Sequence, residues 1–382
     1  MTKQKLVVWD VDGPINYRGR QGTVPADCCY TPGFRSGGPP GDDSYDFVVK
    51  NSALVKLTLD ILHQNNITSV IGSQRIQMQD DDPSYGNFVK AMYGGLDHFF
   101  DNKRPYLNEE LARKIGGKIA NENTQVSKNM LLKAYQDEFN CQPQDIILID
   151  DHDGYGTLAE EAEHMFVLAP GDGTYGAASN SYLFETLLRI IPVHDIYNAM
   201  EQSNVSNTVK NDFKKELVSY QLNNLEKVTT WQEKVLVEEG LLKYEQPDTN
   251  TTITPSEKSA KQVLQGIQYL VMDTKWDIGF LGGVRIVDEK TGLSNTVPKG
   301  MNQILNAIKQ AQDGKTSWDD ALKNVEKIVE TSSAKKDHGF LNQRSEATQI
   351  FYEQTKQRLI ELRSNEKAPE EELKNATTFP KS

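Results

Sequence analysis

Short apolar runs alternate with longer stretches of helical periodicity over the first half of the chain. Runs of aliphatic and β-branched residues are typical of buried strands and occur at residues 6–9, 68–71, 146–149 and 164–168, with a further strand expected at 97–100. Apolar positions three and four residues apart predict helices at 51–65, 84–93, 107–120, 127–139 and 180–191. Strands that alternate with helices of this length predict an α/β fold, with a Rossmann-type parallel sheet flanked by helices.

The second half of the chain is dominated by long helical stretches. Residues 208–240 place apolar side chains along one helical stripe, and Thr316 or Ser317 is expected to cap another helix. The apolar run 284–287, a turn at 289–292 and a second short run predict one hairpin. This half is therefore expected to be mainly helical.

The change of pattern near residue 203 divides the chain into three expected parts. Residues 1–203 form the α/β domain and residues 204–363 a mainly helical domain whose partner the sequence does not identify. Residues 364–382 are polar, include the acidic run Glu370 to Glu372, and are expected to be disordered. By contrast, the Gly/Pro-rich residues 14–46 predict a long irregular excursion inside the first part.

Composition narrows the classes of partner. The formal net charge of -12 argues against non-specific nucleic-acid binding and against a basic membrane-surface patch. No apolar run is long enough for a transmembrane segment, and the start of the chain does not have the pattern of a signal peptide. The three cysteines, at 28, 29 and 141, suit a reducing compartment better than a disulfide framework.

Polar side chains follow three of the predicted strands. Asp10 and Asp12 come after the first strand, Ser73 after the second, and Asp150-Asp151 after the strand at 146–149. In parallel sheets, ligands bind at the carboxyl ends of the strands. These residues are therefore expected to share one edge of one sheet.

Two carboxylates at this spacing suit phosphoryl transfer. Asp10 can attack phosphorus, and Asp12 can protonate the leaving group and then activate water. Asp10, the backbone carbonyl of Asp12 and an acid of the Asp150-Asp151 pair would suffice to bind Mg²⁺, which prefers oxygen ligands. Asp153 is an alternative to Asp150 as the supporting acid.

Two further residues are expected to bind the phosphoryl group. Ser73 offers a hydroxyl to a phosphoryl oxygen. Lys128, at the start of a predicted helix, can hold the nucleophile and the phosphate by charge, and Lys103 competes for this role because it follows a predicted strand. Each residue also has a simpler reading, Ser73 as a helix cap and Lys128 as an ordinary surface lysine.

In order and spacing these residues resemble the four motifs of the haloacid dehalogenase superfamily. Asp10-Val11-Asp12 resembles the first motif, Ser73 the second, Lys128 the third and Asp150-Asp151 the fourth, and the resemblance spans residues 4–192. It implies a Mg²⁺-dependent phosphatase with an aspartyl-phosphate intermediate on Asp10 and with Asp12 as acid and base. Pro14 departs from the Thr or Val that phosphatases of this superfamily usually carry there.

A second phosphatase pattern is present and is interpreted as chance. Residues 29–36 have the spacing Cys29-x5-Arg35-Ser36 of cysteine-dependent tyrosine phosphatases. That phosphate-binding loop requires a helix directly after it, so that the helix N-terminus faces the anion. The Gly/Pro-rich residues that follow Ser36 cannot begin such a helix.

The expected substrate is a phosphorylated protein. No folded cap is predicted after the first motif or after the third strand, so the site is expected to be open, as in superfamily members that act on proteins. Trp9 before the nucleophile resembles the tyrosine phosphatases of the superfamily, and Tyr17, Tyr30 and Phe34 could pack on an aromatic substrate. The alternatives are a small-metabolite phosphatase and an inactive scaffold that acts as a binding module.

The acidic tail suggests where the protein acts. Glu370 to Glu372 in a short polar end resemble the C-terminal signals of type IV secreted effectors of intracellular bacteria. The resemblance implies a protein of the bacterial cytoplasm that is delivered into a host cell by type IV secretion, where its substrate would be a host protein.

Overall fold

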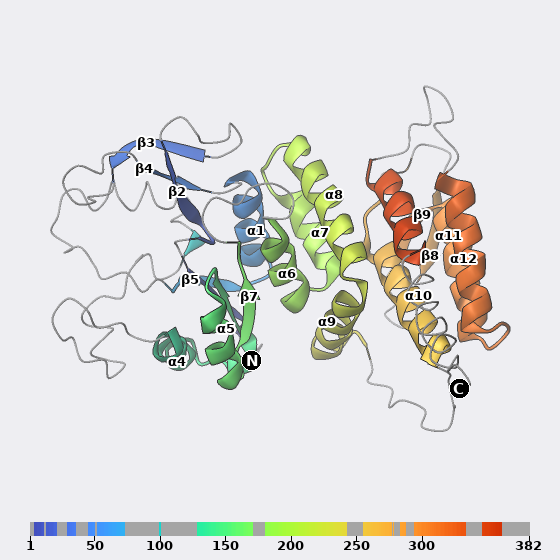
Figure 1. Ribbon diagram of the computed structural model, residues 1–382, viewed down its shortest axis with the longest axis horizontal. Helices are drawn as coiled ribbons and strands as arrows, with labels where there is room; N and C mark the ends of the chain where they lie inside the picture. The colour runs from blue at the N-terminus through green and yellow to red at the C-terminus, as the bar shows by residue number, and fades with distance from the viewer. Residues whose placement is uncertain are drawn as a thin grey trace, which may run out of the picture. The chain divides into compact units, whose positions relative to one another are not determined.

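The computed structural model describes residues 4–10, 13–20, 29–35, 45–49, 52–72, 99–100, 128–170, 180–242, 255–276, 278, 283–287, 294–333 and 346–360. The chain divides into two compact units (Figure 1). The first comprises Met1–Ile190 and Asn198–Val209, and the second comprises Ile191–Tyr197 and Lys210–Ser382.

A four-stranded parallel sheet forms the centre of the first unit. Its strands are β1 (Leu6–Trp9), β5 (Thr68–Ile71), β6 (Ile146–Asp150) and β7 (Met165–Leu168), in the order β5-β1-β6-β7. Each is an apolar run that the sequence predicts as a strand, so the α/β class and the parallel sheet are confirmed. Phe100 forms a parallel bridge with Ser69 of β5, at the end of the strand expected at 97–100.

The strand order places a switch point beside β1. From β1 the chain moves outward to β5 and the Phe100 bridge, and it later returns to the other side of β1 to add β6 and β7. Trp9 is in register with both Ile71 and Ile149, so β1 and β5 end at the same level and β6 ends one residue further, at Asp150. In open α/β sheets, ligands bind in the crevice at such a point, which here lies between the ends of β1 and β6.

Helices cover the sheet and bury its apolar side chains. On one face, α4 (Lys128–Phe139) and α5 (Asp153–Glu161) pack on alternate residues of the central strands. The helices α1 (Ser52–Gln64) and α6 (Ser181–Ile190) contact each other and the sheet (Figure 1). Three of these helices, α1, α4 and α6, confirm the predictions at 51–65, 127–139 and 180–191, whereas α5 was not predicted. The helices predicted at 84–93 and 107–120 lie outside the described residues.

The expectation of an irregular segment at 14–46 is wrong in part. The strands β2 (Asn16–Arg20), β3 (Cys29–Arg35) and β4 (Tyr45–Val49) form an antiparallel sheet in the order β2-β4-β3. Strand pairing of this kind depends on partners elsewhere in the sequence. The Gly and Pro residues of the connections make the whole segment look irregular when only its composition is considered.

Helices make up most of the second unit. Its described helices are most of α8 (Asn207–Asn223), then α9 (Leu225–Glu238), α10 (Pro255–Asp273), α11 (Lys299–Gln312), α12 (Trp318–Ser333) and residues 346–360. The boundary between the two units falls within α7 (Val193–Gln202) and again within α8. Strands β8 (Gly283–Val287) and β9 (Ser294–Pro298) form the predicted hairpin. Ser317 is the predicted cap of α12, because its Oγ accepts a hydrogen bond from the Asp320 amide at 3.1 Å.

The stretch predicted as helical from 208 to 240 is two helices. The backbone leaves the helical conformation at Asn224, whose side-chain amide donates to the Tyr220 carbonyl at 3.0 Å. Asparagine competes in this way for backbone groups that would otherwise continue a helix. None of the described helices is long and apolar enough to cross a membrane.

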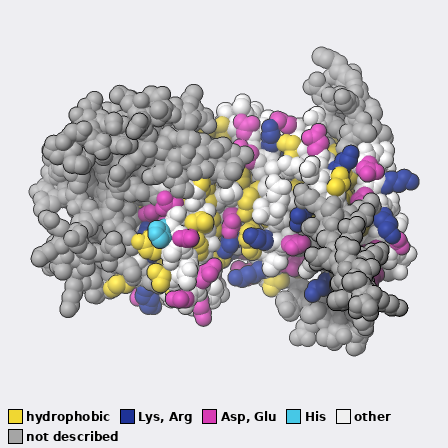
Figure 2. Space-filling view, viewed as in Figure 1, with side chains coloured by type: hydrophobic (Ala, Val, Ile, Leu, Met, Phe, Trp, Pro, Cys, Tyr) yellow, Lys and Arg dark blue, Asp and Glu magenta, His cyan; other side chains and the backbone are white. Residues whose placement is uncertain are grey.

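Charged side chains of both signs are mixed on the surface. On the face that Figure 2 shows, the described Lys and Arg side chains are interspersed with Asp and Glu and form no broad basic patch. A cationic surface of the kind that binds nucleic acid is therefore not seen on the described part of this face.

Candidate functional site

Backbone hydrogen bonds fix the end of β1 between its two neighbours. The Asp10 amide donates to the Ile149 carbonyl at 2.9 Å, and the Gly72 amide donates to the Trp9 carbonyl at 2.7 Å. The side chain of Trp9 is fully buried, with its ring edge-on to Phe100 and its Nε1 3.3 Å from Ser69 Oγ. Trp9 is therefore a core residue, and the side chain of Asp10, 14% exposed, is the first to reach the crevice.

Lys128 joins the ends of three strands. Its Nζ lies 2.9 Å from Asp10 Oδ1 and 3.0 Å from Asp150 Oδ2, and it donates a hydrogen bond to the Gly72 carbonyl at the end of β5. The side chain is 2% exposed, and its ammonium group lies over the Tyr155 ring at 5.6 Å. Lys128 is thus no surface lysine. Lys103, the alternative, lies outside the described residues.

The charge of Lys128 is stabilised by its neighbours. Burial alone would lower its pKa, but the charges of Asp10 and Asp150 and their hydrogen bonds together raise the pKa above its usual value. The lysine is therefore a permanent cation. Against it stand the three carboxylates of Asp10, Asp150 and Asp151, so the cluster retains a net negative charge of about two.

The three aspartates form a group that could hold a metal ion. Each offers an oxygen, and these oxygens lie within 4.8 Å of one another. Asp150 is fixed in place because its Oδ1 accepts a hydrogen bond from the His152 amide at 2.9 Å, while Asp151 is only partly buried. An all-oxygen donor set with an excess negative charge fits a hard divalent cation.

Gly13 allows the turn after Asp12 to approach Asp151. Its φ of +95° is one that L residues rarely adopt, and a Cβ at this position would lie 2.4 Å from Cγ and Oδ2 of Asp151. The Asp151 carboxylate therefore lies against the backbone of Gly13. Only glycine satisfies both conditions, and this requirement was not predicted from the sequence.

The same turn has a second anchor that the sequence did not indicate. Tyr182, on α6, is 2% exposed, and its hydroxyl donates to the Pro14 carbonyl at 2.7 Å. Pro14 itself and Ile15 are buried. A tyrosine at an apolar position of an amphipathic helix gives no sequence signal for such a bond, so only the fold reveals it.

The remaining predicted residues are placed as follows. Asp12 and Ser73 lie outside the described residues. The Asp153 side chain is 91% exposed and that of His152 69% exposed, so Asp150 and not Asp153 faces Lys128. His152 instead caps α5 through its Nδ1, which accepts from the Gly154 amide, as expected for a solvent-facing residue.

The segment that carries the Cys29-x5-Arg35 spacing is a strand. Residues 29–35 form β3, which pairs with β4 and has an irregular register between Tyr30 and Arg35. A phosphate-binding loop instead curls around the anion and leads into a helix. The interpretation of this spacing as chance therefore agrees with the fold.

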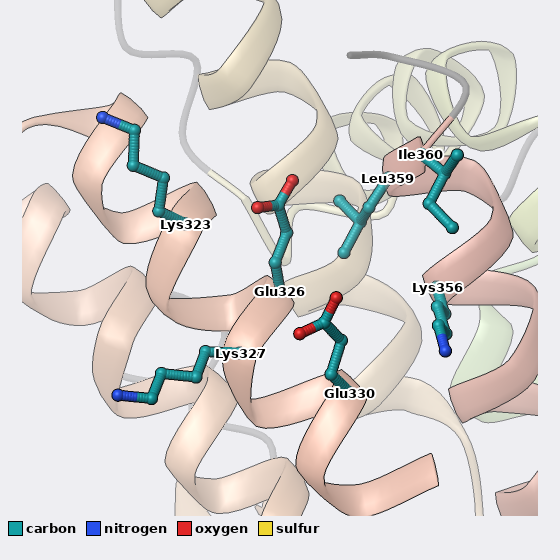
Figure 3. A pocket seen from close by; sticks show the side chains of 7 residues that line it. All are labelled: Lys323, Glu326, Lys327, Glu330, Lys356, Leu359 and Ile360. Carbon is teal, nitrogen blue, oxygen red and sulfur yellow. The ribbon is translucent and has the colours of Figure 1, made fainter. Parts of the chain in front are cut away.

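A pocket in the second unit lies between α12 and the helix at 346–360. In Figure 3 the carboxylates of Glu326 and Glu330 extend into it, near Lys356, while Lys323 and Lys327 extend from the other side of α12. Lysines and glutamates three and four residues apart are typical of a solvated helix face. We therefore interpret these charged side chains as a solvated helix surface and not as a ligand-binding site.

Comparison with known proteins gives no match: no protein-family model, no curated protein and no solved structure matches the chain. The functional argument therefore rests on the residues at the sheet edge and on their geometry.

Proposed function

We propose that the protein is a Mg²⁺-dependent phosphomonoester hydrolase that forms an aspartyl-phosphate intermediate on Asp10. One observation carries the proposal: Asp10 lies at the switch point of the sheet, beside a buried lysine and within 4.8 Å of two further carboxylates. The four-motif resemblance to haloacid dehalogenase phosphatases involves the same residues.

The aspartates are the residues that would hold the cation. Asp10, Asp150 and Asp151, with the backbone carbonyl of Asp12, would supply its protein ligands. Bound Mg²⁺ offsets the repulsion between an anionic nucleophile and a phosphate. Lys128 contributes positive charge in the same direction, and its ion pair with Asp10 holds that carboxylate in place.

The first half-reaction transfers the phosphoryl group to Asp10. A carboxylate oxygen of Asp10 forms a bond to phosphorus, and the bond between phosphorus and the ester oxygen breaks. Asp12 gives its proton to the departing oxygen, so that an alcohol or phenol leaves. Ser73 donates a hydrogen bond to a phosphoryl oxygen during this step.

The second half-reaction returns the enzyme to its starting state. Asp12, now a carboxylate, takes a proton from a water molecule as the water oxygen attacks phosphorus. The bond between phosphorus and Asp10 breaks, inorganic phosphate leaves, and Asp10 is again a free carboxylate. One water is consumed per ester hydrolysed.

The proposed substrate is a phosphotyrosine protein. We propose that Tyr17, which lies in β2, and Tyr30 and Phe34, which lie in β3, are the aromatic residues that pack on an aryl substrate. Delivery through the Glu-containing tail stays a prediction, because residues 361–382 lie outside the described part of the chain. Deletion of residues 364–382 is expected to abolish translocation, and unchanged translocation would exclude this signal.

The proposal is tested by hydrolysis of an aryl phosphate with and without Mg²⁺. We expect Asp10→Asn and Asp12→Asn each to remove nearly all activity, since one loses the nucleophile and the other the proton donor. Cys29→Ser is the matched control and should retain full activity. Activity that persists in Asp10→Asn would refute the mechanism, and loss in Cys29→Ser would restore the cysteine alternative.

A substrate panel separates the remaining alternatives. We expect phosphotyrosine peptides to be hydrolysed faster than phosphoserine peptides and sugar phosphates. A sugar phosphate or nucleotide that exceeds every peptide would instead indicate a small-metabolite phosphatase. No turnover of any ester by a folded protein that binds Mg²⁺ would favour an inactive scaffold that acts as a binding module.

A further inference from the structure

The turn after β1 is held by a buried hydrogen bond from another element. Tyr182 lies on α6, and its hydroxyl donates to the Pro14 carbonyl at 2.7 Å. Both residues are buried, so water does not compete for this carbonyl. The bond therefore fixes the backbone of the chain two residues after Asp12.

A second contact restrains the same turn at the neighbouring residue. The Cα of Gly13 faces Asp151 so closely that a Cβ there would lie 2.4 Å from the carboxylate carbon. Ile15, which follows Pro14, is fully buried. The turn is thus fixed by α6 at Pro14, by Asp151 at Gly13 and by the core at Ile15.

Tyr182 can act only as a hydrogen-bond donor in this position. Burial raises its pKa well above the usual range, so the phenol keeps its proton wherever the protein is folded. The Tyr182 hydroxyl bonds to the Pro14 carbonyl, so its influence on the chemistry passes through the backbone of the turn.

We propose that Tyr182 is a positioning residue that holds the turn 13–15 so that Asp12 can deliver its proton to the leaving group. The inference rests on the proposed function, in which Asp12 is the general acid. A general acid must lie within hydrogen-bond reach of the departing oxygen, and small displacements of catalytic groups cause large losses of rate. The anchor on Pro14 supplies this restraint.

The test uses the dependence of rate on the leaving group. Proton donation matters most for esters whose leaving group is a poor one and least for 4-nitrophenyl phosphate, whose phenolate leaves without help. The value of kcat/KM reports on the step that expels the leaving group and is insensitive to later hydrolysis of the aspartyl phosphate. We therefore expect Tyr182→Phe to reduce kcat/KM about tenfold more for phenyl phosphate than for 4-nitrophenyl phosphate.

Lys5→Met is the matched control. Lys5 precedes β1, and its Nζ donates to the Ile190 carbonyl of α6 at 2.9 Å, so this bond joins the same helix to the opposite end of the same strand. Its loss should change kcat/KM equally for every ester. A purely structural role for Tyr182 predicts the same uniform change, and a uniform change or none in Tyr182→Phe would overturn the inference.

A second readout does not depend on activity. We expect amide hydrogen exchange over residues 10–16 to be faster in Tyr182→Phe than in the wild type and unchanged in Lys5→Met; unchanged exchange in both would overturn the restraint itself. Asp10→Asn, assayed in parallel, distinguishes failure of the proposed function from failure of this inference alone. Full activity there refutes the proposed function and this inference with it, whereas activity lost there together with a uniform loss in Tyr182→Phe refutes the inference alone.

Discussion

The ammonium group of Lys128 lies 2.9 Å from the carboxylate of Asp10, which ties the first residue of α4 to the residue that follows β1. The same ammonium is 3.0 Å from Asp150, whose side chain is 1% exposed. Buried charges are tolerated only when they are paired with opposite charges. The folded state therefore depends on all three members of this cluster, independently of any catalytic role.

Removal of the shared cation is expected to destabilise the protein. In Lys128→Met the side chain keeps most of its volume, but two like charges remain close together in the core. We expect the free energy of unfolding to fall by about 3 kcal/mol, measured by chemical denaturation. Combining Lys128→Met with Asp150→Asn should recover part of this loss, because the second change removes the uncompensated charge.

A second lysine of the same helix provides the control. Lys133 pairs with Asp137 at 2.8 Å, but its side chain is 62% exposed. Lys133→Met should therefore change the free energy of unfolding by less than about 0.5 kcal/mol. Equal losses for the two lysines, or simple additivity in the Lys128/Asp150 double variant, would contradict the description of a coupled buried cluster.

Mg²⁺ is expected to stabilise the folded protein through Asp151. A ligand that binds only the folded state raises its stability by about 2.7 kcal/mol at one hundred times its dissociation constant. Thermal unfolding of the wild type should therefore shift upward as Mg²⁺ is added, and Asp151→Asn should largely remove the shift. Asp153→Asn is the control, because Asp153 is 91% exposed and outside the cluster. The same Mg²⁺ shift in all three proteins would rule out Asp151 as a ligand.

Gly13→Ala should impair activity more than its effect on backbone strain explains. The new Cβ would meet the Asp151 carboxylate, so either the turn or Asp151 must move. We expect a loss of activity of tenfold or more, together with a destabilisation of about 1–2 kcal/mol from the positive φ. Gly240→Ala is the matched control, since Gly240 has φ +70° but no atom within 4 Å of an added Cβ. It should share the stability loss and keep full activity.

Much of the first unit is predictable because its strands are continuous apolar runs. The runs at 68–71 and 146–149 form β5 and β6 in the structure, and β6 extends one residue further, to Asp150. Buried parallel strands have this pattern because both faces are covered by helices. The same pattern predicts that Asp10, Asp150 and Asp151 lie at one edge of the sheet, because the carboxyl ends of parallel strands meet there.

Other features depend on partners that a linear pattern does not contain. The sheet β2-β4-β3 joins segments separated by Gly/Pro-rich connections, and α8 ends just before Asn224, whose side-chain amide donates to the Tyr220 carbonyl. The anchor of Tyr182 on Pro14 links residues from opposite ends of the first unit. The sequence therefore predicts which charged residues lie at the edge of the sheet, but the contacts that hold them in place can be seen only in the fold.

The stability of the protein should also depend on a histidine remote from the aspartates. His164, directly before β7, is 5% exposed, and neither ring nitrogen has a hydrogen-bond partner among the residues that the structure describes. Burial, with a smaller contribution from the charge of Lys133, lowers its pKa below the usual value. In the folded protein the ring is therefore neutral at a pH where the unfolded chain already binds a proton.

This difference predicts that acid destabilises the protein through His164. As the pH falls through about 6.5, the unfolded state gains a proton that the folded state does not, so the free energy of unfolding decreases, by at most about 1.4 kcal/mol per pH unit. The decrease ends once the pH reaches the lower folded-state pKa. His164→Phe should reduce the difference in unfolding free energy between pH 7.5 and pH 5.5, whereas Val167→Ala, at a buried site of β7 that does not titrate, should lower stability equally at both. An unchanged difference in His164→Phe would show that other groups set the acid sensitivity.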